Sequence, residues 1–369
     1  NSNKRFKATL GGGWNQYTGS HYGEVIWSEF ASNGDIRHRY YENDALKNDL
    51  NIYAKLNYFI HPKLSIFADL QFRRIDYTFE GPYVRPNGDQ TMQDQTLHWL
   101  FFNPKAGVNY DVDSRNRIYA SAAIGNREPS RTEIVESSQI TRPTHETRYD
   151  YELGYERKTR RYRFAANAYW MHYLNQLVLS GKVNDVGAYI KQNVDNSDRY
   201  GIELSWCWNI IEKLQWTSNF TYSRNRISSF TEYVDDYDNG GQVEIEHGDT
   251  DISFSPNYIA GSELKYRIVK NLYFAFITKY VGEQFLDNTS NSSRKLDDFL
   301  INNIRIDYTA KWKFFKEIGL GIQLNNIFNQ LYESNGYTFS YIYGGETTTE
   351  NFYYPQAGFH FMTSVSLRF

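Results

Sequence analysis

The sequence predicts an all-β protein, an antiparallel transmembrane β-barrel with about fourteen strands. Three observations support this prediction. Apolar and polar residues alternate in repeated segments, short and long connections alternate between these segments, and aromatic residues make up 17% of the 369 residues. Because successive side chains of a strand point to opposite faces, each such segment has one apolar and one polar face. In an outer-membrane barrel the apolar face meets lipid and the polar face lines the lumen.

The closing segment, residues 359–369, shows this alternation most clearly. One face carries Phe359, Phe361, Thr363, Val365, Leu367 and Phe369. The opposite face carries His360, Met362, Ser364, Ser366 and Arg368. The segment 318–324 follows the same rule, since Leu320 and Ile322 alternate with glycine and Gln323. We therefore expect the apolar face to be turned toward lipid and the polar face toward the lumen.

Similar strand patterning recurs from the first residues to the last. The segments lie near residues 4–14, 50–60, 64–73, 106–110, 118–124, 149–156, 162–170, 200–208, 214–222, 258–268, 304–312, 318–324 and 359–369. The count is about fourteen strands, at the spacing expected for outer-membrane barrels.

The connections between these segments alternate in length. Short ones fall near 61–62, 111–115, 158–161, 209–213, 269–271 and 313–316. Long ones fall near 15–47, 81–96, 126–146, 180–198, 232–252, 286–298 and 331–357. Short turns on one rim and long loops on the other are typical of bacterial outer-membrane barrels. Trp208, Trp216, Tyr266, Trp312 and Phe314 flank the short turns and predict an aromatic belt there. A soluble β-sandwich or repeat protein is the alternative, but its connections rarely alternate so regularly.

Bulk composition excludes several other classes of protein. The net charge of -3 gives no indication of a nucleic-acid partner. Cys207 is the single cysteine, so no internal disulfide or cysteine metal cluster is predicted. Mean hydropathy is -0.66, and no run of about 18 apolar residues predicts a transmembrane helix.

Several motifs resemble those of TonB-dependent outer-membrane receptors, and the last three named below resemble motifs of the branch found in Bacteroidota. They comprise Leu324-Asn325-Asn326-Ile327-Phe328-Asn329-Gln330-Leu331-Tyr332, Tyr353-Tyr354-Pro355-Gln356-Ala357-Gly358, Asn126-Arg127-Glu128-Pro129-Ser130-Arg131, Asp150-Tyr151-Glu152-Leu153-Gly154-Tyr155 and Phe254-Ser255-Pro256-Asn257. Their order and spacing carry the resemblance, which covers essentially the whole chain. It implies a 22-stranded barrel filled by an N-terminal plug that bears a TonB box. Neither plug nor TonB box is visible in this sequence.

Residues 1–369 are therefore expected to be the C-terminal part of a receptor barrel, about fourteen of its 22 strands. The plug and about eight earlier strands are expected to lie elsewhere in the same protein or in a separate chain. A barrel must close, because unpaired backbone groups are not tolerated in lipid. The segment 359–369 consequently needs a partner on its free edge.

The resemblance implies active transport across the outer membrane of a Gram-negative bacterium, and no enzymatic activity. The implied energy source is TonB with ExbB and ExbD, acting through the plug. An iron–siderophore complex is the expected solute; haem, cobalamin, a glycan, or passive diffusion through a porin are the alternatives. Outer-membrane lipid and lipopolysaccharide are expected to surround the barrel. Val365, Leu367 and Phe369 resemble the signal read by the barrel-assembly machinery, although an ordinary apolar strand end would look the same.

The candidate ligand-binding residues lie in the long loops, where binding residues gather on rigid scaffolds. Arg127 and Arg131 are candidates to hold an anionic ligand through charge-assisted hydrogen bonds; pairing with lipopolysaccharide or nearby acids is the alternative. Tyr337, Tyr341 and Tyr343 are candidates to stack on a ligand ring, unless they only stiffen their loop. We expect these side chains to point into a vestibule above the lumen.

Metal and catalytic chemistry have weaker support. Asp235, Asp236 and Asp238 form the densest acidic loop and are a candidate Ca²⁺ site, but they lack EF-hand spacing, and a solvated loop is the alternative. No intrinsic cofactor is predicted, and the identity of any metal is unknown. No catalytic residues are predicted either. A lipid hydrolase would require a serine–histidine pair such as Ser364 and His360, which more simply share a lumen face.

Overall fold

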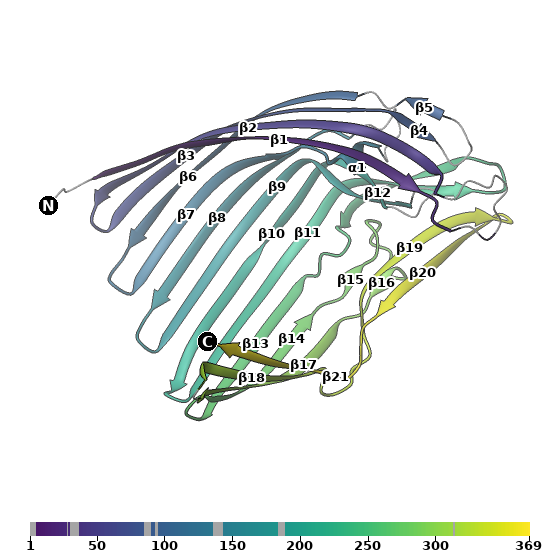
Figure 1. The fold of residues 1–369 in the computed structure, drawn as a ribbon. Helices are drawn as coiled ribbons and strands as arrows, with labels where there is room; N and C mark the ends of the chain where they lie inside the picture. Colours follow the sequence, from purple (N-terminus) through teal and green to yellow (C-terminus); the bar gives the residue numbers. More distant parts are fainter. Residues whose placement is uncertain are drawn as a thin grey trace.

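A single curved sheet dominates the computed structural model. The structure describes residues 5–27, 29, 37–84, 90–92, 95–135, 143–183, 189–312 and 314–369. Within these residues it contains a 19-stranded sheet, a separate two-stranded sheet and one short helix. Figure 1 shows the large sheet bent into a trough, with tight hairpins along one rim and long excursions at the other.

Fourteen strands pair consecutively and antiparallel around this trough. In order they are β1 (Phe6–Glu24), β2 (Arg39–His61), β3 (Leu64–Glu80), β6 (Gln95–Asp111), β7 (Asn116–Arg127), β8 (Glu146–Lys158), β9 (Tyr162–Val183), β10 (Tyr189–Ile211), β11 (Leu214–Asp236), β13 (Tyr258–Val269), β14 (Leu272–Val281), β17 (Phe299–Trp312), β18 (Phe315–Asn325) and β21 (His360–Arg368). The predicted number of wall strands is therefore confirmed.

The remaining elements lie at the long-loop rim. They are β4 (Pro82–Val84), β5 (Gln90–Met92), α1 (Arg131–Val135), β12 (Gln242–Asp251), β15 (Gln284–Phe285), β16 (Lys295–Leu296), β19 (Glu333–Tyr343) and β20 (Glu346–Pro355). Each falls within a long connection that separates two wall strands.

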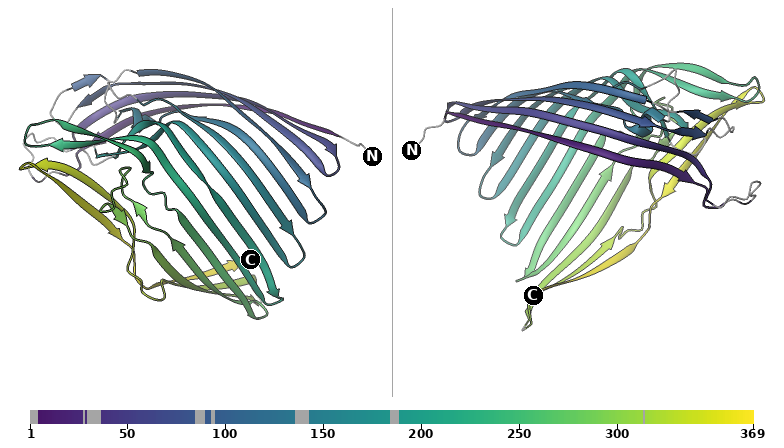
Figure 2. Two further views of the ribbon diagram at one scale, coloured as in Figure 1. Left: turned by 180° about the vertical axis from the view of Figure 1, so that it is seen from behind. Right: turned by 45° about the horizontal axis from the view of Figure 1, so that its top comes forward.

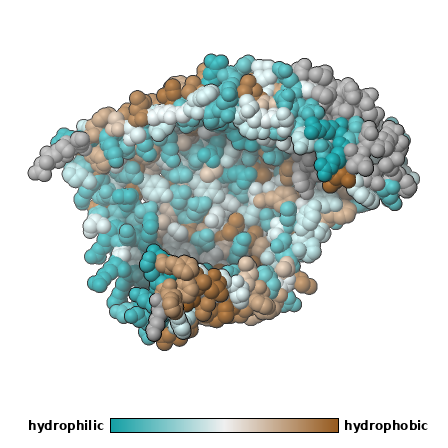
Figure 3. Space-filling model, viewed as in Figure 1, coloured by the Kyte–Doolittle hydropathy of each residue, from teal (hydrophilic) through white to brown (hydrophobic). Residues whose placement is uncertain are grey.

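The two faces of the sheet differ in polarity. Figure 3 shows a largely hydrophilic hollowed face, and apolar side chains gathered on the lower lip, over the outer side of β18 and β21. Leu320 and Ile322 of β18 and Val365 of β21 are exposed apolar residues, at 45%, 44% and 67% of full exposure. On the opposite, polar face of the sheet, Arg305 forms ion pairs with Glu263 and Asp307. This arrangement agrees with the apolar-out, polar-in prediction.

Several strands are longer than the sequence indicated. The prediction of a long loop at 15–47 is wrong. The strand β1 continues to Glu24 and β2 begins at Arg39, and the two pair through this interval, for example at Tyr17↔Lys47. The loop expected at 180–198 is likewise largely strand. Toward the long-loop rim the outer face of a strand need not be apolar, and parts of the inner face are packed, as the buried Ala45 and Val194 show. The strand keeps its hydrogen-bond ladder there, but the apolar-out, polar-in alternation that predicts strands is lost.

Two further loops expected from the sequence are β-hairpins. The interval 232–252 holds the end of β11 and β12, and the interval 331–357 holds β19 and β20. The β19–β20 turn is Gly344-Gly345, with φ of 66° and 77°, the backbone that a two-residue hairpin turn requires. The hairpins join where Asp235 and Asp236 pair in parallel with Tyr341 and Ile342.

The sheet has two edges among the described residues. β1 pairs with β2 alone, and β21 pairs with β18 alone. Figure 2 shows the same open trough from behind and tilted forward. Among the described residues, the first and last strands of the sheet are therefore not joined to each other.

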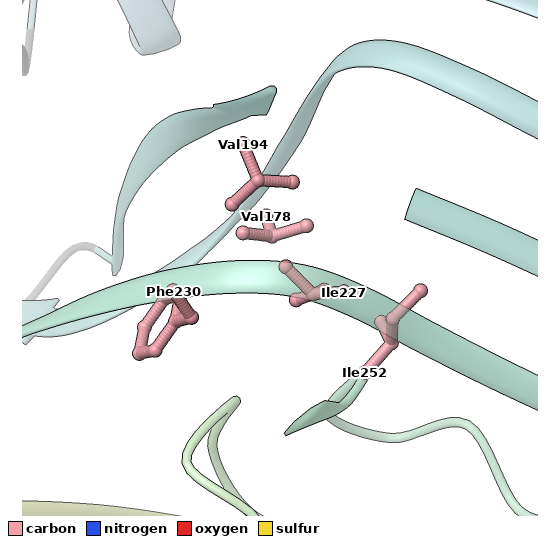
Figure 4. Close-up of a cluster of buried hydrophobic side chains, with 5 residues drawn as sticks. All are labelled: Val178, Val194, Ile227, Phe230 and Ile252. Atoms are coloured by element: carbon pink, nitrogen blue, oxygen red, sulfur yellow. The ribbon is translucent and has the colours of Figure 1, made fainter. Parts of the chain in front are cut away.

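Buried apolar packing is concentrated toward the long-loop rim. Val178, Val194, Ile227, Phe230 and Ile252 form one such cluster, between β9, β10, β11 and the end of β12 (Figure 4). A second cluster joins Ala45, Tyr77 and Phe79 to Ile134 of α1. These clusters hold the loops against the strand ends and so give the rim a defined shape.

Candidate functional site

The two arginines predicted to bind an anion belong to the segment around α1. Ser130 and Glu133 form a capping box, in which Ser130 N–H donates to Glu133 Oε2 at 2.7 Å and Glu133 N–H donates to Ser130 Oγ at 3.3 Å. Arg127 Nε donates to Glu146 Oε2 at 2.7 Å. Arg131 Nη2 donates to Asn43 Oδ1 at 2.6 Å. Both guanidinium groups thus have partners within the protein.

The same segment is fixed to the hollowed face by further charges. Glu128 accepts from Lys47 at 2.9 Å and from Arg73 at 3.0 Å, and Arg73 also pairs with Asp49 at 2.6 Å. Lys191 donates to Glu133 at 2.8 Å. Burial alone would raise the pKa of Glu133, but the hydrogen bonds from Lys191 and Ser130 and the nearby Arg127 outweigh it and lower that pKa below 4.5. These contacts order the surroundings of Arg127 and Arg131, whose role in ligand binding stays a prediction.

The three predicted tyrosines of β19 lie in different surroundings. Tyr337 stacks on Phe352 with ring centroids 4.7 Å apart and an interplanar angle of 8°. Tyr341 packs against Tyr237, and its hydroxyl donates to Glu350 at 3.1 Å. Tyr343 is 69% exposed. The structure therefore separates them, and Tyr341 alone of the three lines the cavity described below.

The acidic loop is held by hydrogen-bond donors of the protein. Asp235 Oδ1 accepts from Gln242, and Asp236 accepts from the backbone N–H groups of Asp238 and Asn239. The Asn239 side chain and these amides lower the pKa of Asp236. Asp238 accepts from the N–H groups of the Gly344-Gly345 turn at 2.8 and 2.7 Å. A Ca²⁺ ion would have to compete with these donors, and its binding here stays a prediction.

A cavity of about 250 Å³ lies beside this joint between the hairpins. Its wall combines residues from β9, β11, β12, β19 and the loop between β15 and β16. The lining residues are Ser180, Phe230, Glu232, Tyr233, Asp235, Tyr237, Gln242, Asp287, Thr289, Arg294, Thr338, Phe339, Ser340 and Tyr341. We call it the Arg294 cavity, after the one cation among these lining residues.

Arg294 is buried and links three elements through its guanidinium. Nη1 donates to Glu232 Oε1 at 2.6 Å and to Asp287 Oδ2 at 2.7 Å, while Nη2 donates to Ser340 Oγ at 2.7 Å. Burial lowers the pKa of Arg294, but the charges of Asp287 and Glu232 outweigh it and raise the pKa above its usual value. The guanidinium therefore stays charged and holds the β15–β16 loop to β11 and β19.

The two carboxylates have other partners besides Arg294. Glu232 Oε2 lies 2.8 Å from His247 Nε2, across the β11–β12 hairpin. Asp287 Oδ1 accepts from the Thr289 hydroxyl at 2.7 Å. By contrast, Arg294 Nε and Thr338 Oγ1 are buried without a hydrogen-bond partner. A buried polar atom without a partner costs about 1–3 kcal/mol, so the wall has unused hydrogen-bonding capacity.

Sequence reasoning missed Arg294, Glu232 and Asp287. Odd residues of β11 are buried up to Ile227, whereas Phe230, Glu232 and Val234 are buried beyond it. The switch occurs where the β11–β12 ladder skips Ser228 and Asp249, and Asp249 has a φ of 50°. Strand parity therefore could not show that Glu232 is buried, and the only sequence signal was the clustering of polar residues at 287–294.

The remaining sequence candidates lie away from this cavity. Ser364 and His360 are four residues apart on β21, a separation of roughly 13 Å, and His360 Nδ1 lies 2.9 Å from the Gly358 carbonyl. The assembly-signal residues Val365, Leu367 and Phe369 are exposed, and the Phe369 ring packs against Phe315. In the described part of the chain, no group of three or more His, Cys, Asp or Glu residues is arranged to hold a metal ion. No helix among the described residues is long and apolar enough to cross a membrane.

The sequence matches a family model of β-barrel proteins, in agreement with the wall of fourteen antiparallel strands. Residues 1–329 match the family described as TonB dependent receptor-like, beta-barrel. The chain belongs to this family of TonB-dependent receptors. The family resides in the outer membrane, and its members are transporters rather than enzymes.

Solved structures of TonB-dependent receptors share the fold of this chain. The ferric-catecholate import receptor Fiu from E. coli K12, in its closed form, superposes with a TM-score of 0.73 at 13% identity, over 99% of this chain and 52% of Fiu. The siderophore receptor PiuA from Acinetobacter baumannii gives 0.70 at 15% identity, over 99% and 53%. The copper transporter OprC gives 0.70 at 15% identity, over 98% and 54%. The chain thus spans about half the length of the solved structures that it matches.

Proposed function

We propose that this chain is the C-terminal barrel part of an outer-membrane transporter that takes up a scarce solute, with an iron–siderophore complex as the solute. The observation that carries the proposal is the family match over residues 1–329. The described similarity to Fiu and PiuA, an iron import receptor and a siderophore receptor, supports the choice of solute. The similarity to OprC makes copper the second candidate. Uptake would draw on TonB with ExbB and ExbD.

We also propose that further strands close the barrel between β1 and β21. Each of these strands has one hydrogen-bonded neighbour among the described residues. In lipid, an open edge would leave a row of backbone N–H and C=O groups unsatisfied, at several kcal/mol each. The partner strands are expected to precede β1 in the complete receptor, together with a plug inside the trough.

Energy-dependent uptake tests the transport proposal. Cells that express the complete receptor should accumulate a radiolabelled ferric siderophore, and a protonophore or loss of TonB should abolish accumulation. Uptake that survives both treatments would indicate a passive porin and contradict the proposal. Accumulation of copper in place of iron would retain the transporter and reject the siderophore.

The two loop arginines allow a sharper test of the ligand. If they hold an anionic solute, the double variant R127A/R131A should weaken its binding, and R127K/R131K should retain most of the affinity. Lys279→Ala is a suitable control. Lys279 is also an exposed cation, and it lies on the polar face of the sheet, in β14. Equal affinity of R127A/R131A and K279A for the solute would remove both arginines from the site.

A further inference from the structure

The short turns of the wall are joined into one rim. In five successive contacts of 2.7 to 3.0 Å, a main-chain N–H near the end of a strand donates to a carbonyl of the preceding short turn. The accepting residues are Lys63, Arg115, Arg161, Lys213 and Asn271. Four of these five residues are basic, and Lys270 precedes the fifth. Figure 1 shows the turns following one another along this rim, so the repeat places basic residues of neighbouring turns side by side.

The rim is positively charged. Counted from the last residue of one strand to the first of the next, the six short turns hold eight basic and three acidic residues, a formal charge of +5 in a chain of net charge −3. Arg115, Lys158 and Arg160 are exposed, and none of them forms an ion pair within the part of the chain that the structure describes. Short turns of outer-membrane barrels face the periplasm. These cations therefore lie at the level of the lipid head groups of the periplasmic leaflet.

An apolar groove of about 790 Å³ opens beside two of these turns. Its floor consists of small side chains, those of Ala68, Ala106, Ala120 and Ala122. The alanines share one face of the sheet, because Ala68 lies opposite Ala106 and Ala106 lies opposite Ala122. Ile66, two residues from Ala68, is exposed on this same face. The groove therefore belongs to the apolar face that meets lipid.

The groove lies in the leaflet next to the turns. Ile66, in its lining, is two residues beyond the β2–β3 turn, and Ala122 is six residues beyond the β6–β7 turn. At about 3.3 Å per residue, the floor extends to roughly 20 Å along the strands. With strands tilted by about 40°, this is roughly 15 Å along the membrane normal, or half of a hydrocarbon core of about 30 Å.

Hydrocarbon is complementary to this groove, and an anionic group is complementary to the adjoining turns. Apart from Tyr58 and Ser121, the lining side chains carry no polar group. An unfilled depression loses dispersion contacts with the atoms that line it, and a flexible acyl chain restores them. Basic residues at a membrane surface attract anionic head groups, and each one adds to the attraction. A molecule with a hydrocarbon chain and an anionic head satisfies both requirements.

We propose that this part of the wall binds one anionic phospholipid of the periplasmic leaflet, with an acyl chain on the alanine floor and the phosphate group at the turns. Lys63, Arg115 and Lys158 are the cations assigned to the head group, since their turns are hydrogen-bonded in succession. The Lys63 ammonium donates to the Val112 carbonyl at 2.8 Å, which leaves two of its three donors for a phosphate. The proposal rests on the outer-membrane location of the family and not on the transported solute.

Native mass spectrometry of the purified complete receptor tests the proposal. The receptor is delipidated in a non-ionic detergent and titrated with phosphatidylglycerol or with phosphatidylcholine of the same acyl chains, so that only the head group differs. It should bind one molecule of phosphatidylglycerol at least tenfold more tightly than phosphatidylcholine. Equal affinities for the two lipids would overturn the proposal.

Two triple variants locate the head group. K63Q/R115Q/K158Q removes the three assigned cations and should weaken phosphatidylglycerol binding roughly tenfold or more. K213Q/K270Q/K316Q removes three exposed cations from the same rim, away from the groove, and should bind like the unaltered receptor. Heat-modifiable gel mobility verifies that each barrel is folded. Equal affinities of the two triple variants would refute the assigned cations.

Filling the groove tests the position of the acyl chain. A106L/A122L places two larger apolar side chains on the floor and should weaken phosphatidylglycerol binding severalfold. Ala310→Leu, on the apolar face of β17 outside the groove, should leave binding unchanged. Phosphatidylglycerol with a photoreactive acyl chain should label peptides that cover residues 64–70, 104–110 and 118–124 in the unaltered receptor and in A310L. The same labelling of A106L/A122L would exclude the groove as the acyl site.

A second copy of the chain is the competing occupant. Receptor dimers that dissociate in A106L/A122L, without a retained lipid, would assign the groove to a second copy and contradict the proposal. These measurements require neither TonB nor an energy source, so failure of lipid binding leaves the proposed uptake intact. Conversely, loss of energy-dependent uptake in cells would reject the transporter without changing the affinity for the lipid.

Discussion

Replacing Arg294 by methionine removes the cation that holds two buried carboxylates together. The side chains of Arg294, Glu232 and Asp287 are 7%, 11% and 6% exposed, and Arg294 Nη1 lies 2.6 and 2.7 Å from the two carboxylate oxygens. Removing one partner of a buried ion pair typically costs 3–5 kcal/mol. Because Glu232 keeps His247 and Asp287 keeps Thr289, we expect the lower end, about 3 kcal/mol.

Native-state hydrogen exchange measures this loss locally. With a factor of ten for every 1.4 kcal/mol, the R294M variant should exchange roughly a hundredfold faster in peptides that cover residues 283–298 and 336–349. The loop between β15 and β16 should detach from β11 and β19 while the strands nearer the short turns keep their protection. Such a local opening is expected because elements of a protein open with different free energies.

The neighbouring Lys295 provides a matched control. Lys295 Nζ lies 2.9 Å from Glu283 Oε1, a distance similar to those in the Arg294 ion pairs. These two side chains, however, are 25% and 65% exposed. An exposed pair contributes about 0–1 kcal/mol, so Lys295→Met should exchange almost like the unaltered protein. Adding E232Q and D287N to R294M should restore part of the protection by removing the uncompensated charges. Equal exchange of R294M and K295M would refute the buried network.

Four further predictions concern the wall and its loops. Ile322→Lys should destabilise the membrane-embedded barrel by about 2–4 kcal/mol if it lies near the midplane, whereas Gln323→Lys should cost little; equal folding yields in lipid vesicles would contradict the assignment of faces. The pKa of Glu133 is lowered in the folded protein, so its stabilisation is present above pH 4.5 and is lost as pH falls through the folded value; exchange in the α1 segment should rise under acid and be unchanged by acid in the Glu133→Gln variant. Asp238→Ala should separate the β11–β12 and β19–β20 hairpins and speed exchange of the glycine turn roughly tenfold, and an unchanged rate there would show that this bond does not hold them. Deletion of Phe369 should reduce the amount of receptor assembled in the outer membrane, measured by heat-modifiable gel mobility; normal assembly would identify it as an ordinary strand end.

The wall of the barrel was accessible to sequence reasoning. A strand between lipid and lumen must be apolar on one face and polar on the other, so residues 318–324 and 359–369 record their orientation in the sequence itself. The short hairpins can be predicted from the sequence as well, because a turn such as that between His61 and Leu64 interrupts the alternation for only two residues. The number of wall strands followed from these two signals.

The upper parts of the strands were not accessible in the same way. Tyr17 and Lys47 pair in a regular ladder, but an outer face that lies beyond the lipid need not be apolar, so the alternation is lost there. Main-chain hydrogen bonds, which are indifferent to side-chain type, maintain these extensions. Their extent is therefore decided by pairing with neighbouring strands and not by local composition.

The candidate site was decided by tertiary structure. The sequence pointed to Tyr341 and Asp235, which line the Arg294 cavity, and to Arg127 and Arg131, which lie outside it and pair with Glu146 and Asn43. Arg294 meets Glu232 across 62 residues of sequence and Ser340 across 46. A buried charge is stable only where the fold brings its partners together from distant segments. The sequence by itself thus determined which strand faces meet lipid, whereas only the packing of loops from four strand pairs determined which polar side chains enclose the cavity.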